Sequence, residues 1–133
     1  MTLNIRVIAP DRTVWDANAE EVILPSSTGQ LGILTGHIPL LTALDIGVMR
    51  VRIDKDWVPI VLMGGFAEID NNKITILVNG AEETIDIDIS LAQKNLEEAT
   101  AQLTQAISTK DKIEATQNIR KARARLQAVV TIN

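Results

Sequence analysis

Residues 73–93, with the sequence KITILVNGAEETIDIDISLAQ, contain the change of pattern that decides the fold. Lys73–Val78 is rich in β-branched residues, as in a strand, and Asn79-Gly80 follows as a strong hairpin signal. Ser90-Leu91-Ala92-Gln93 has the spacing of a helix capping box, with a Ser cap and a Gln three residues later. The chain is therefore predicted to change from strands to helices near residue 87.

The composition differs on the two sides of this stretch. Residues 1–86 hold all four prolines and all seven glycines, whereas residues 87–133 hold no proline, glycine or aromatic residue. Because glycine and proline mark turns and break helices, the first part is expected to be all-β and the second uninterrupted helix. Charge divides in the same way: 6 Lys/Arg against 12 Asp/Glu give −6 before the boundary, and 7 against 5 give +2 after it.

Short runs of β-branched residues fill the first part. The glycines of Gly29-Gln30-Leu31-Gly32 and Gly64-Gly65 are interpreted as turn residues between strands. Many short strands at this spacing are typical of a sandwich or a barrel. The strands are expected at 2–8, 12–15, 21–24, 48–53, 57–63, 66–70 and 73–78.

Two apolar stripes with helical spacing follow. A second capping box, Ser108 with Asp111 three residues on, separates them, so two antiparallel helices are predicted. Half of the stripe residues are alanine, which either lets the helices approach closely or leaves them weakly held. The stripes are Ala92, Leu96, Ala99, Leu103 and Ala106, then Ala115, Ile119, Ala122, Leu126 and Val129.

The composition excludes several classes of site. No cysteine is present and His37 is the single histidine, which excludes a thiol nucleophile and a multi-histidine metal centre. Three aromatic residues and a net charge of −4 argue against nucleic-acid binding. No glycine-rich phosphate motif occurs, and paired acids such as Glu82-Glu83 are interpreted as solvated turn residues. The sequence predicts a protein that is not an enzyme and has no metal or cofactor.

Membrane insertion is not expected either. The longest apolar runs fall far short of the ~20 residues that a membrane span needs, and no cleavable signal is expected at the start of the chain.

Cations gather near the end of the chain. From Ala115 onward it carries Arg120, Lys121, Arg123 and Arg125 and no acid. They spread over a broad helical face, which either is simply solvated or forms a docking surface for an acidic partner segment. His37, within Gly36-His37-Ile38-Pro39, has two open interpretations as well: a structural or merely exposed loop residue, or a partner contact.

The segment Gly29–Leu44, GQLGILTGHIPLLTAL, followed by a helical hairpin, resembles the epsilon subunits of F-type ATP synthases. The resemblance covers the whole chain, and Leu62–Ala67 and Arg120–Arg125 are similar to the plastid and cyanobacterial branch. It implies a β sandwich over residues 1–86 and an α-helical hairpin over residues 87–133. The implied role is a non-catalytic rotor subunit in the central stalk of the proton-translocating enzyme.

The resemblance also implies partners. The sandwich would bind the gamma subunit and the c-ring, with a loop carrying Gln30 and His37 facing the ring. The helical hairpin would inhibit ATP hydrolysis when extended along gamma, as the four cations Arg120, Lys121, Arg123 and Arg125 meet an acidic loop of the beta subunits in the alpha/beta catalytic head. The location would be the thylakoid membrane, peripheral, on the stromal or the cyanobacterial cytoplasmic face, with membrane contact through the c-ring alone.

One departure concerns nucleotides. Some bacterial members bind ATP through Ile/Leu-Asp-x-x-Arg-Ala, and the matching stretch here is Ile87-Asp88-Ile89-Ser90-Leu91-Ala92. Because Leu91 replaces the arginine, a phosphate partner is lost and tight ATP binding is not expected. A nucleotide-sensing domain and a generic adaptor outside ATP synthase remain the alternative hypotheses.

Overall fold

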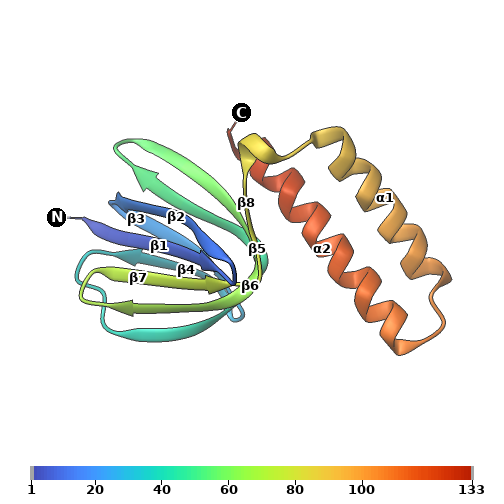
Figure 1. The fold of residues 1–133 in the computed structure, drawn as a ribbon, viewed down its shortest axis with the longest axis horizontal. Coiled ribbons are helices and arrows are strands. Elements are labelled where there is room, and N and C mark those ends of the chain that lie inside the picture. Colours follow the sequence, from blue (N-terminus) through green and yellow to red (C-terminus); the bar gives the residue numbers. More distant parts are fainter. Residues whose placement is uncertain (1, 133) are drawn as a thin grey trace.

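The computed structural model describes residues 2–132, with side chains up to Val129. A β sandwich lies beside a two-helix hairpin, as Figure 1 shows. The strands are β1 (Leu3–Ala9), β2 (Arg12–Ala19), β3 (Glu21–Ser26), β4 (Gly29–Leu34), β5 (Leu40–Ile53), β6 (Asp56–Asp70), β7 (Lys73–Val78) and β8 (Ala81–Glu83). A 3-10 turn at Thr84–Asp86 leads to the helices α1 (Ile89–Gln105) and α2 (Thr109–Ile132).

The strands form one hydrogen-bonded path in the order β2-β1-β7-β6-β5-β3-β4, with β8 paired to β6. β1 runs parallel to β7, and the other pairs are antiparallel. Because β5 and β6 are long and curved, the path folds over on itself and makes both layers of the sandwich (Figure 1). The predicted sandwich and helical hairpin are confirmed.

The interior of the sandwich is aliphatic. β1 alternates buried and more exposed residues along its length, as expected for a strand with one face on a core. The largest fully buried side chains are Leu3, Ile5, Val7, Val22, Leu24, Ile33, Met49, Ile60, Leu62, Ile69, Ile74 and Ile76.

Gly64-Gly65 is not a turn between two strands, as the sequence suggested, but a bend inside the continuous strand β6. Gly64 has φ +81° and Gly65 φ +148°, conformations that side chains rarely adopt. A Cβ on Gly65 would collide with the carbonyl oxygen of Leu77 on the neighbouring strand. The two glycines therefore let β6 pass from one layer to the other without breaking its pairing with β5. Gly32, also interpreted as a turn residue, lies inside β4 opposite Ile23.

The hairpin predicted at Asn79-Gly80 does not form. β7 pairs with residues 65–70 of β6, whereas β8 pairs with residues 60–62 of the same strand, beyond the bend. Asn79-Gly80 therefore carries the chain past the bend of β6 to its other half.

The two capping predictions had different outcomes. The Asp88 side chain, rather than Ser90, caps α1 by accepting a hydrogen bond from the Leu91 N–H at 3.1 Å. Ser108 caps α2 as predicted, accepting from the Asp111 N–H at 3.1 Å. Alanines from both helices are buried along the seam between them: Ala92, Ala99, Ala115 and Ala122.

Candidate functional site

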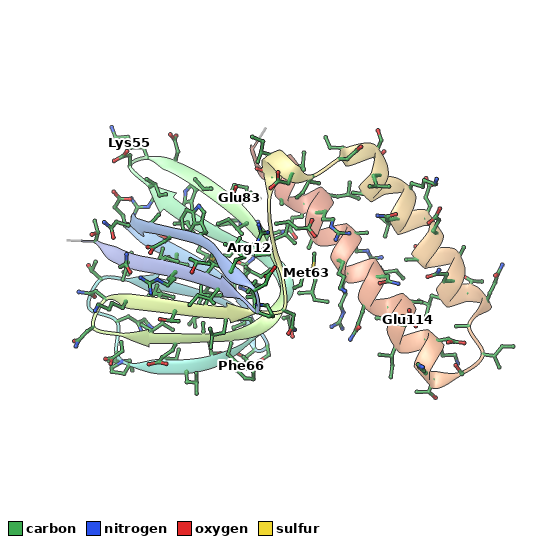
Figure 2. The ribbon with its side chains drawn as sticks, in the orientation of Figure 1. Arg12, Lys55, Met63, Phe66, Glu83 and Glu114 are labelled. Atoms are coloured by element: carbon green, nitrogen blue, oxygen red, sulfur yellow. The ribbon has the colours of Figure 1, made fainter. Side chains whose placement is uncertain are left out.

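The hairpin is attached to the sandwich through α2. Ala124 and Ala128 pack against Val48 of β5 and Val61 of β6, and all four are buried. Ile46, Met63 and Ile87 pack around them, and Figure 2 shows Met63 on the side of the sandwich that faces α2. α1 packs on the other side of α2, so α2 is the middle layer (Figure 1). Since α2 contributes mainly alanine methyl groups, this apolar contact with the sandwich is small.

A charged pair, Arg125 of α2 and Glu82 of β8, also joins the hairpin to the sandwich. The Arg125 Nε donates to Glu82 Oε1 at 2.8 Å, and the second guanidinium bond reaches Glu82 Oε2 at 2.7 Å. The two side chains are 25% and 30% exposed. The pKa of Arg125 is raised above its ordinary value, chiefly by the hydrogen bond from its side chain to Glu82 and against the opposing effect of burial. Both oxygens of one carboxylate are therefore committed to one guanidinium.

This pair corrects the interpretation of Glu82 as a solvated turn acid. Glu82 lies on β8 directly opposite Val61, a member of the apolar contact with α2. The side chain of Glu83, the next residue, is half-buried and makes no hydrogen bond or ion pair with residues 2–129.

The four cations predicted as one group do not share an environment. Arg120 and Arg123 are exposed and Lys121 is half-buried, whereas Arg125 points to the sandwich. Within the described part of the chain, Arg120, Lys121 and Arg123 form no ion pair, and we call them the unpaired cations. Helical geometry could have signalled part of this division, because Arg123 and Arg125, two residues apart, lie ~200° apart around the helix axis. Lys121, four residues before Arg125, lies on the same side of the helix as Arg125.

The family resemblance implied that Gln30 and His37 lie on one loop, but the structure separates them. Gln30 is the second residue of β4, next to a turn that Ser27 ties to the Ala43 carbonyl by a 3.0 Å hydrogen bond. His37 follows the other end of β4, in a loop that Gly36 ties to the Asn72 side chain at 2.7 Å. The strand between them separates the two residues, and both are accessible on or beside the edge strand β4.

The His37 loop carries exposed apolar residues. Leu34, Ile38 and Leu41 are 54%, 73% and 71% exposed, values that are unusual for large aliphatic side chains grouped around one loop. His37 Nδ1 lies 2.7 Å from the carbonyl oxygen of Ile38. The loop therefore presents an apolar tip with an imidazole beside it.

A second apolar surface runs across four strands. Ile8, Leu77, Phe66 and Ala43 are successive partners on β1, β7, β6 and β5. Phe66 and Leu77 are 56% and 53% exposed. They border a shallow hollow of about 620 Å³, and Figure 2 labels Phe66 at the lower side of the sandwich. The sequence reasoning missed this surface, because which residues align across strands depends on a register that cannot be read locally.

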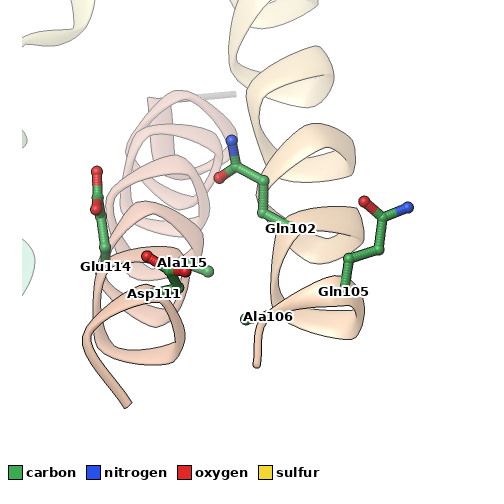
Figure 3. A pocket seen from close by; sticks show the side chains of 6 residues that line it. All are labelled: Gln102, Gln105, Ala106, Asp111, Glu114 and Ala115. Atoms are coloured by element: carbon green, nitrogen blue, oxygen red, sulfur yellow. The ribbon is translucent and has the colours of Figure 1, made fainter. Parts of the chain in front are cut away.

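The hollow at the tip of the hairpin does not suit a nucleotide. It has a volume of about 290 Å³ and is lined by Gln102 and Gln105 of α1 and by Asp111 and Glu114 of α2. Figure 3 shows Gln102 pointing towards α2. Two carboxylates would repel phosphate groups. Leu91, at the position of the bacterial arginine, is 54% exposed.

Residues 2–132 offer no metal centre and no membrane-spanning helix. No group of three His, Asp or Glu side chains lies close enough to hold a metal ion there. Neither α1 nor α2, over the residues described, is both long and apolar enough to cross a bilayer.

Both parts of the chain match one known family. Residues 2–84 match the beta-sandwich domain of the ATP synthase delta/epsilon chain, and residues 86–129 match its long alpha-helix domain. The chain belongs to the ATP synthase delta/epsilon family. Within this family it is an epsilon subunit of the F-type enzyme, as its close relatives show.

Among these epsilon chains, the chloroplastic one of Porphyra purpurea is 77% identical over 128 residues, which are 96% of each chain. The epsilon chain of the cyanobacterium Thermosynechococcus vestitus is 63% identical over 131 residues, covering 96% of this chain and 95% of the relative. The predicted resemblance to the plastid and cyanobacterial branch is confirmed.

Solved structures share the epsilon fold at low sequence identity. A chain in the OSCP/F1/c-ring structure of the Euglena gracilis mitochondrial ATP synthase superposes with a TM-score of 0.85 at 21% identity, covering 97% of this chain and 81% of that one. A chain in the central stalk/c-ring structure of the Tetrahymena thermophila enzyme gives a TM-score of 0.68 at 14% identity, with 97% of each covered.

Proposed function

We propose that this epsilon chain is a non-catalytic rotor subunit that couples gamma to the c-ring and inhibits ATP hydrolysis through its C-terminal helices. The sandwich, residues 1–86, contacts gamma and the ring, and residues 87–133 regulate. The observation that carries the regulatory part is the attachment of α2, which rests on small apolar side chains and one charged pair. An interface of this size can open without unfolding either part.

In this proposal the sandwich contacts the c-ring through its edge strand β4. Gln30 and His37 lie at or beyond opposite ends of that strand, so one flat partner surface touches both residues only if it lies along the edge. The exposed Leu34 and Ile38 add apolar area near the His37 end. The contact with the membrane is then indirect, through the ring.

The inhibitory state places the helices along gamma, towards the alpha/beta catalytic head. A rod made of residues 90–130 would reach ~60 Å, at ~1.5 Å per residue. Arg120, Lys121, Arg123 and Arg125 then meet an acidic segment of the beta subunits. The unpaired state of three of these cations in the folded hairpin supports this role, because their charge is available to a partner.

The location follows the relatives, which are chloroplastic and cyanobacterial epsilon chains. We place the subunit peripherally at the thylakoid membrane, on the stromal face in a plastid or the cytoplasmic face in a cyanobacterium. Tight ATP binding has no part in the proposal, because Leu91 supplies no charge for a phosphate.

Removal of residues 88–133 tests the regulatory part. ATP hydrolysis by the reconstituted complex should rise, because the sandwich that contacts gamma and the ring is retained while the inhibitory helices are lost. The matched control is the complex with the full chain, assembled in parallel and checked for its subunit content by gel. Unchanged hydrolysis by a complex that contains the truncated chain would contradict inhibition by the helices.

A further inference from the structure

We propose that Glu82 is an internal competitor of the acidic partner segment: it occupies Arg125, so the partner must displace one carboxylate with another before it can take α2 from the sandwich. This inference rests on the proposed function for the identity of the partner, but its chemistry can be tested on the isolated chain. The partner is defined here as a peptide segment rich in Asp or Glu.

The geometry makes the two interactions compete for the same edge of the guanidinium group. Arg125 uses its Nε and one terminal nitrogen on the two oxygens of Glu82, at 2.8 and 2.7 Å. This parallel two-bond arrangement is the preferred way for a guanidinium to bind a carboxylate. A second carboxylate cannot use the same two donors, so binding of Arg125 to a partner in this mode requires that Glu82 leaves.

The pair joins the parts of the molecule that would separate. Glu82 belongs to β8 of the sandwich and Arg125 to α2, 43 residues further along the chain. It lies beside the apolar contact, because Glu82 pairs with Val61, which packs with Ala124 and Ala128. The pair therefore adds a charged contact to the apolar one at the surface where α2 meets the sandwich.

The cations near Arg125 give an acidic segment a first binding surface, from which it can replace Glu82 as the partner of Arg125. Arg120 and Arg123 are exposed and carry no ion pair within residues 2–132, and the stretch from Ala115 to the end contains no acid. An acidic segment is therefore attracted to α2 before Arg125 is released. Strengthening the internal pair should weaken binding of the segment, and weakening the pair should strengthen it.

The first measurement follows the docking of α2 in the isolated full chain. The chain has no cysteine, so spin labels can be placed on cysteines at Lys55 in the sandwich and Ile107 at the hairpin tip, both exposed. Glu82→Gln should raise the population with undocked helices roughly 2- to 5-fold, the effect of losing a partly exposed ion pair. Glu83→Gln, which removes the same charge one residue away, is the matched control and should leave the distances unchanged.

A charge exchange separates the pair from other effects of the substitution. Glu82→Arg combined with Arg125→Glu should return the distances towards those of the unaltered chain, whereas Glu82→Arg alone should undock the helices. No recovery in the double variant, or equal distances in Glu82→Gln and the unaltered chain, overturns the role of the pair.

The second measurement uses a short poly-glutamate peptide as the acidic probe. Glu82→Gln should bind it roughly 2- to 5-fold more tightly than Glu83→Gln does, and binding should change the label distances of the unaltered chain in the same direction as Glu82→Gln does. Equal affinities, or binding without undocking, would overturn the competition. Because neither measurement uses ATP synthase, these results are independent of whether truncation changes ATP hydrolysis.

Discussion

Replacement of Gly65 by alanine should destabilise the sandwich strongly. Gly65 has φ +148°, and a Cβ at this position would collide with the Leu77 carbonyl oxygen and approach the Val78 Cα to 2.8 Å. Both are backbone atoms of β7, which pairs with β6 at Gly65 and Phe66. Because backbone atoms cannot rotate away as a side chain can, there is no easy way to make room for the Cβ. The bend of β6 must therefore shift or its pairing with β7 must open.

The expected cost has two components. An alanine held in this backbone region costs ~1–3 kcal/mol, and displacement of packed backbone costs a further ~1–3 kcal/mol. The total of about 2–6 kcal/mol is a large fraction of the ~5–15 kcal/mol by which domains are stable. For a chain of this length the melting temperature should fall by roughly 6 °C or more.

Guanidinium unfolding followed by the fluorescence of Trp15 and Trp57 measures this effect, because both lie in the sandwich. The control is Gly32→Ala in β4, where φ is not positive and no atom lies within 4 Å of the added Cβ. Its free energy of unfolding should change by less than ~0.5 kcal/mol. Equal midpoints for the two variants would refute the assigned role of the bend.

Three further predictions concern the hairpin. Ser108→Ala should cost ~0.5–2 kcal/mol in hairpin stability, because the Asp111 N–H loses its acceptor, whereas Ser90→Ala, which removes no cap, should not; circular dichroism during thermal unfolding compares the two. Alanine at all three unpaired cations should raise ATP hydrolysis of the complex, and by more at low salt; a hydrolysis rate equal to that of the unaltered complex would mean that these cations are merely solvated. Calorimetry with ATP should give no heat of tight binding, since Leu91 replaces the arginine; a saturable heat in the micromolar range would restore the nucleotide-sensing hypothesis.

The helical hairpin could be predicted because its signals are local. Residues 87–133 lack glycine and proline, and the alanine stripes have helical spacing, so composition and periodicity agree. The position of the first cap was wrong because Asp88 and Ser90 are both favoured cap residues, two positions apart, and the local pattern does not choose between them.

The bend of β6 and the partner of Arg125 could not be predicted from local pattern. A Gly-Gly pair indicates an interruption, but whether the strand ends there or bends depends on how closely β7 approaches. Likewise, Glu82 and Arg125 are 43 residues apart, and their contact exists only after α2 has packed on β6. Both features are products of tertiary packing rather than of sequence spacing.

The central claim, that the helices must leave the sandwich to inhibit ATP hydrolysis, is tested by linking the hairpin covalently to the sandwich. Cysteines at Glu82 and Arg125, joined by a short bismaleimide, would replace the charged pair by a covalent link in a chain that has no other cysteine. The complex with the linked chain should hydrolyse ATP as fast as the complex with residues 88–133 removed, and the unlinked double-cysteine chain should still inhibit. Inhibition by the linked chain equal to that by the unlinked one would contradict the proposal that the helices must leave the sandwich to act.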